Sequence, residues 1–148
     1  MTDTREAILE QLLVIAKAID GVGGRAFRNR DQLSETARPA IVILDGDETA
    51  EERPADGRPA RTPERIAMTP EIYVIVGGGE GPVGAGLNSL RAKIIAAIAA
   101  DGTLAALVGS NGSIRYDGCA TDLGRGRTMQ GEMGLGFTFR YVLSPAKL

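Results

Sequence analysis

The chain has 148 residues, a formal net charge of −2 and 43% hydrophobic residues, a length and composition typical of one globular domain over residues 1–148. Histidine is absent and Cys119 is the only cysteine, which excludes Ser-His-Asp and Cys-His catalysis, the usual zinc sites and an internal disulfide. The slightly acidic balance argues against general nucleic-acid binding. We therefore expect a protein without cofactor, metal ion or enzymatic activity.

The N-terminal part of the sequence predicts one helix and two strands. Apolar residues recur every three or four positions over residues 4–19, which predicts an amphipathic helix capped by Asp3 and Glu6. A short strand is predicted over residues 25–29. Residues 40–44 are apolar on both faces, which is typical of an interior strand, and Asp45-Gly46-Asp47 predicts a turn after it. The first residues lack a basic stretch followed by an apolar one, so no signal peptide is expected.

Residues 45–65 form a long polar segment, first acidic and then rich in arginine and proline. Its apolar residues do not recur at the spacing of a helix or a strand. A polar excursion of this length inside a small domain is usually functional. A calcium loop of the EF-hand type does not fit, because Ala50 stands where such a loop needs glycine. We expect an exposed excursion that extends the flanking strands at its ends and contacts a partner through Asp45, Asp47, Glu48, Glu51, Glu52, Arg53, Arg58 and Arg61.

The second half of the sequence predicts three strands and one helix. A strand over residues 66–76 should bulge at Pro70, and a helix is expected over residues 87–100, with Thr103 capping a short turn after it. Strands over 114–119 and 132–143 should flank a polar loop. The order α-β-β-β-α-β-β predicts an α+β fold, in which two helices pack on one face of a mainly antiparallel or mixed sheet. The most apolar run has only seven residues, so no membrane span is expected.

Two further features have a plain and a functional interpretation. Arg115 and Arg140 lie on strands opposite apolar neighbours, which indicates either an exposed sheet face or a face that pairs with acids of a neighbouring subunit. The glycine-rich run of residues 77–86 occupies the position of a phosphate-binding loop. Leu87 and Asn88 follow it instead of the Lys and Ser or Thr of a P-loop. A flexible connection is favoured there, and a small anion- or nucleotide-binding module is the alternative function.

The ordered features resemble the tail terminator family of long-tailed bacteriophages, which includes the lambda minor tail protein U. The resemblance covers nearly the whole chain and depends on the order and spacing of several stretches rather than on one motif. These are the first helix, Phe27-Arg28-Asn29-Arg30, Arg38-Pro39-Ala40-Ile41-Val42-Ile43-Leu44-Asp45-Gly46, Pro70-Glu71-Ile72-Tyr73-Val74, Leu87-Asn88-Ser89-Leu90-Arg91, Ile114-Arg115-Tyr116-Asp117-Gly118 and Phe137-Thr138-Phe139-Arg140-Tyr141.

The resemblance implies a structural virion protein in the phage tail and neck, assembled in the cytoplasm of a bacterial host. Such a protein forms a ring, usually a hexamer, on the head-proximal end of the tail tube. The ring stops tube polymerisation and joins the tail to the head. Its partners are further copies of itself, the tail tube protein and the head-tail connector, with no membrane, and DNA passes through without sequence-specific binding. Another neck or tail-completion protein is the alternative within this class.

Overall fold

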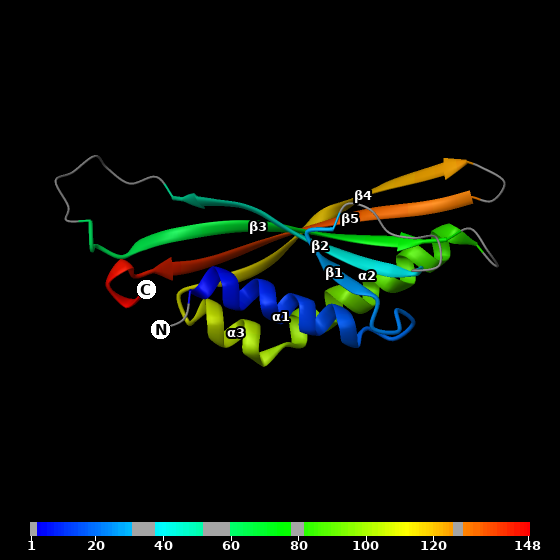
Figure 1. The fold of residues 1–148 in the computed structure, drawn as a ribbon. Helices are drawn as coiled ribbons and strands as arrows, with labels where there is room; N and C mark the ends of the chain where they lie inside the picture. The colour runs from blue at the N-terminus through cyan, green and yellow to red at the C-terminus, as the bar shows by residue number, and fades with distance from the viewer. Residues whose placement is uncertain (1–2, 31–37, 52–59, 78–81, 126–128) are drawn as a thin grey trace.

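The computed structural model describes residues 3–30, 38–51, 60–77, 82–125 and 129–148. These residues form one five-stranded sheet with its helices on one side (Figure 1). The elements are, in chain order, α1 Thr4–Ala18, β1 Ala26–Arg28, β2 Ala40–Ala50, β3 Glu64–Val76, α2 Val83–Ala100, α3 Gly102–Val108, β4 Ser113–Arg125, β5 Met129–Leu143 and the 3-10 turn η1 Pro145–Lys147.

The sheet has the strand order β1-β2-β3-β5-β4. β1 runs parallel to β2, and the other three pairs are antiparallel. The predicted α+β class and the mixed, mainly antiparallel sheet are therefore confirmed. The predicted element order was wrong in detail, because a third helix, α3, follows α2.

The core lies between the helices and one face of the sheet. α1 contributes Ile8, Leu9 and Leu12, which are almost completely buried, as the helical spacing predicted. α2 buries a stripe of five residues. By length and composition alone, α2 could also cross a membrane, which the seven-residue apolar run in the sequence did not predict. In the fold this stripe packs against the sheet, whose inward residues include Ile72, Val74, Leu135, Phe137 and Phe139.

Hydrogen bonds at the helix ends correct two of the predicted caps. The Asp3 carboxylate accepts from the Arg5 backbone N–H at 3.1 Å, as expected for an N-cap, but the Glu6 carboxylate accepts from Arg28. The cap of α3 is Asp101 and not Thr103, because the Leu104 N–H donates to Asp101 Oδ1 at 2.7 Å. The second oxygen of Asp101 accepts from Gln11 of α1 at 3.0 Å, so the same residue also ties α3 to α1.

The predicted turn at residues 45–47 is wrong, because β2 continues through it to Ala50. Leu44 pairs with Glu71 and Asp47 pairs with Thr69, so Asp45 and Gly46 together oppose the single residue Pro70. This is a β-bulge on β2, opposite the proline that the sequence marked as irregular. The acidic start of the polar segment is thus strand.

The last two strands are longer than predicted. β4 and β5 pair continuously to Arg125 and Met129, so most of the predicted polar loop is a hairpin. Residues 126–128 lie outside the described part. α2 likewise begins at Val83 rather than at residue 87, and Val83 and Leu87 are both buried.

Candidate subunit interface on the open face of the sheet

The sheet has one face that no helix of the described chain covers, here called the open face. Along β3 and β5 the helix-side residues are buried, and those between them point the other way. On β3 the open face carries Arg65, Glu71 and Tyr73. On β5 it carries Glu132, Gly134, Gly136, Thr138 and Arg140. The charges of this face fall into two groups at opposite ends of the same strands.

One group, the arginine cluster, consists of Arg65, Arg115 and Arg140. In the register, Arg65 pairs with Val142, Arg140 with Ala67 and Arg115 with Thr138, so the three lie on adjacent strands at one end of the sheet. Their surroundings differ, because Arg65 is exposed while the other two form ion pairs within the chain.

Arg115 and Arg140 are each paired with an acid of their own chain. Arg115 Nε donates to Asp117 at 2.6 Å, and Arg140 Nε donates to Glu51 at 3.1 Å. The Thr138 hydroxyl also donates to Asp117. Burial acts to raise the pKa of Asp117, but the hydrogen bonds from Thr138 and Arg115 outweigh it and hold this pKa below its ordinary value. The predicted arginines therefore lie on one face, with their first partners inside the subunit.

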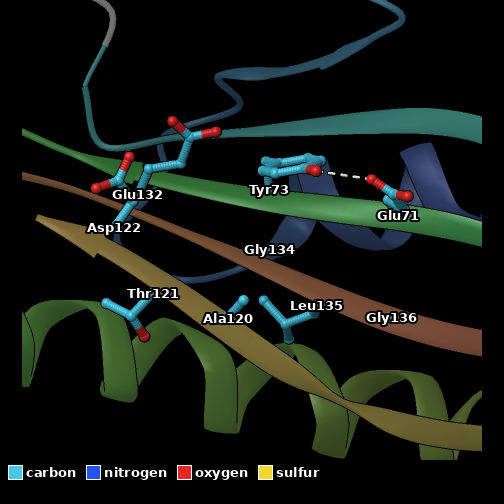
Figure 2. Close-up of a pocket in the computed structure, with 9 residues that line it drawn as sticks. All are labelled: Glu71, Tyr73, Ala120, Thr121, Asp122, Glu132, Gly134, Leu135 and Gly136. Atoms are coloured by element: carbon cyan, nitrogen blue, oxygen red, sulfur yellow. Dashed lines mark hydrogen bonds between the residues drawn. The ribbon is translucent and has the colours of Figure 1, made fainter.

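The second group lines a hollow of about 420 Å³, here called the acidic trough (Figure 2). Three carboxylates border it, from Glu71 of β3, Asp122 of β4 and Glu132 of β5. Small residues at its base leave the space open. The complete lining is Glu71, Tyr73, Ala120, Thr121, Asp122, Glu132, Gly134, Leu135 and Gly136.

Tyr73 lies along the base of the trough because its neighbour in the sheet is glycine. A Cβ added at Gly134 would stand only 3.0 Å from Tyr73 Cε1, so a larger residue there would push the ring away. The Tyr73 hydroxyl donates to Glu71 at 2.7 Å, which fixes the ring at its other end (Figure 2). The hydrogen bond to Glu71, together with burial, raises the pKa of Tyr73.

Asp122 and Glu132 face each other directly in the β4–β5 register. Neither carboxylate forms a hydrogen bond or ion pair with a described residue. Among the described residues no group of three or more Asp, Glu or Cys side chains is arranged to hold a metal ion. The trough is a negatively charged hollow with the Tyr73 ring along its base.

Most described acids of the polar segment have structural roles instead. Asp45 shares the Arg28 guanidinium with Glu6, at 2.7 Å and 2.6 Å, which joins α1, β1 and the bulge of β2. Glu48 accepts from the hydroxyl of buried Tyr141 at 2.6 Å, and burial together with this bond raises the pKa of Tyr141.

The candidate interface is thus only partly where the sequence placed it. Asp45, Glu48 and Glu51 are bonded within the subunit, whereas Asp47 and Arg61 are exposed. Glu52, Arg53 and Arg58 lie outside the described residues, as do residues 78–81 of the glycine-rich run. Five residues of the trough were not predicted from the sequence as site residues, namely Glu71, Tyr73, Asp122, Glu132 and Gly134. The alternation of Glu132, Gly134 and Gly136 between buried Met133, Leu135 and Phe137 was the available signal.

When the sequence is compared with protein-family models and with curated proteins, no family model matches and no curated protein matches significantly.

Proposed function

We propose that the protein is a structural, non-catalytic subunit of a phage tail terminator ring. The observation that carries the proposal is the division of the open face into an acidic trough and an arginine cluster at opposite ends of the same strands. A face of this kind presents two complementary surfaces on every copy, as a repeating subunit needs. The resemblance to tail terminators supports the same assembly.

A ring requires one heterologous interface that closes on itself. Two surfaces at opposite ends of one sheet meet this requirement, because each copy can offer one to the copy before it and the other to the copy after it. The edge strand β4 adds a second exposed surface. It is 13 residues long and pairs only with β5 among the described strands. Exposed strands of this length invite pairing with another chain.

In the proposed ring the DNA passes through the centre without being held. A net charge of −2 suits that role, since phosphate contacts by clustered Lys and Arg would bind DNA electrostatically. On the described open face, two of the three clustered arginines are already neutralised by Asp117 and Glu51. The ring then caps the head-proximal end of the tail tube, stops its growth and presents the surface that meets the head connector.

The proposal is tested by measuring the native mass over a concentration series and imaging the particles by negative stain. We expect closed rings, with six copies as the leading case. The purified protein should also bind one end of assembled tail tubes and stop their elongation in vitro. Tubes that grow to the same length with and without the protein would contradict the terminator function, whatever the mass in solution.

The alternative of an anion- or nucleotide-binding module predicts a different result. Its glycine-rich run leads into α2, whose N-cap residue Pro82 provides no side-chain cap. Calorimetric titration with ATP, GTP and inorganic phosphate separates the two functions. If the protein is a tail terminator, we expect none of these three ligands to bind at micromolar concentrations.

A further inference from the structure

The acidic trough contains a like-charge pair that forms no hydrogen bond or ion pair with a described residue. Asp122 and Glu132 are directly opposite on adjacent strands, on the open face. Like charges in this position destabilise a sheet. Arg38 lines a smaller hollow beside the two acids, yet no ion pair joins it to either of them. A cation bound from outside the subunit would relieve this repulsion.

The shape of the trough favours a guanidinium group over a simple ammonium. Tyr73 places an aromatic ring along the base, with Glu71 beyond its hydroxyl and Asp122 and Glu132 at the opposite end (Figure 2). A planar guanidinium can stack on such a ring and donate to carboxylates in the same plane. Lysine offers only a point charge. The complementary group is therefore an arginine side chain.

The chain carries an exposed arginine on the same face, but too far away to reach its own trough. Arg65 is eight residues before Tyr73 on β3, which corresponds to about 26 Å along a strand. Arg115 and Arg140 are nearer, but they are bonded to Asp117 and Glu51. Arg38 lies beside the two acids but does not line the trough and forms no ion pair with either of them. Since none of these described arginines occupies the trough, an arginine that enters it comes from another molecule.

We propose that the acidic trough of one copy receives Arg65 of a second copy of this chain. The inference rests on the proposed ring, for which it names the subunit contact. The exposed Arg61, four residues before Arg65, adds positive charge to the same end of the sheet. If the contact repeats head to tail with a rotation that closes, it generates a ring, whereas two copies that exchange arginines across a two-fold axis form a closed dimer.

The test uses charge reversal in trans on the full chain. Glu132→Lys makes the trough repel Arg65, and Arg65→Glu makes the incoming residue repel the trough. We expect each variant alone to self-associate at least tenfold more weakly than the wild type in sedimentation equilibrium. An equimolar mixture should recover association, because each altered residue then meets its complement. Glu10→Lys, which alters an exposed acid on α1 away from the open face, is the control and should behave as the wild type.

Each outcome below either supports or overturns the contact between Arg65 and the trough. The tube-capping assay tests the proposed function separately. Weak association of both variants with recovery in the mixture supports the contact. A wild type that stays monomeric at millimolar concentration overturns it, as do variants that associate normally or a mixture that fails to recover while both chains remain folded by circular dichroism. Recovered dimers instead of rings would support the contact and count against the ring. Normal rings from both variants would leave the terminator function standing without this contact.

Discussion

At the scale of single residues, Gly46 determines whether β2 can pass its bulge. Its φ of +69° lies in the left-handed region, and an added Cβ would stand 2.0 Å from the backbone oxygen of Thr69. That oxygen belongs to the paired strand and cannot move aside. We expect Gly46→Ala to lower the free energy of unfolding by about 1–3 kcal/mol, measured by urea denaturation.

Gly84→Ala is the matched control for that change. Gly84 lies in α2 with open space where a Cβ would be. Alanine in place of helical glycine there should leave the stability unchanged or raise it by up to about 1 kcal/mol. Equal losses from the two substitutions would show that the bulge has no special need for glycine.

The ion pairs of Arg28 with Glu6 and Asp45 should make stability depend on pH in the acidic range. The hydrogen bonds from Arg28 lower the pKa of Glu6 and of Asp45 below their ordinary values of 4.5 and 3.8. A carboxylate with a lowered folded-state pKa stabilises the fold above its unfolded pKa, and loses that effect as the pH falls through the folded-state value. The contribution is therefore complete above about pH 5 and declines below it.

Arg28→Met should remove this contribution while keeping a similar side-chain length. We expect the Tm to fall by about 3 °C at pH 7 and the difference from the wild type to shrink toward pH 3, measured by thermal melts at several pH values. A difference that stays constant from pH 7 to pH 3 would contradict the role of the two carboxylates.

At the scale of elements, the sequence predicted Thr103 as the cap of α3, whereas Asp101 occupies that position in the structure. Asp101 accepts from the Leu104 N–H and holds Gln11, while Thr103 is exposed. Asp101→Ala should cost about 1–2 kcal/mol of unfolding free energy, whereas Thr103→Ala should cost almost nothing. Chemical denaturation of the two variants side by side checks this, and the reverse order of losses would restore the sequence-based cap.

The elements that the sequence predicted well are those whose burial follows a local period. α1 and the central part of β3 have such patterns, and β2 was recognised by a continuous run of buried apolar residues. The errors have a common cause, which is tertiary contact overriding local signals. α2 begins early although Gly84 and Gly86 are poor helix formers, because Val83 packs close to Gly131 of β5. β4 and β5 extend through polar and glycine residues because each strand supplies the other with hydrogen bonds.

At the scale of the whole molecule, the acidic trough could not be predicted from the sequence. Its residues come from β3, β4 and β5, and they meet only because Glu132 of β5 pairs with Asp122 on one side and Ile75 on the other. A register shift of one residue would turn these acids toward the helices. Periodicity indicates which residues share a face, but not which strands become neighbours. Arg115 and Arg140 could be assigned to an open face, whereas their bonds to Asp117 and Glu51 could not.

The division of charge over the open face also predicts how self-association responds to salt. Contacts between exposed groups weaken when the Debye length shortens, from about 10 Å at 0.1 M to about 3 Å at 1 M ionic strength. We expect the dissociation constant to rise about tenfold between 0.05 M and 0.5 M NaCl, measured by sedimentation equilibrium. The Glu132→Lys chain, which lacks the attraction, should show a smaller or inverted response. Association that is unchanged or strengthened by salt in the wild type would instead indicate an apolar interface, and would place the subunit contact away from the trough and the arginine cluster.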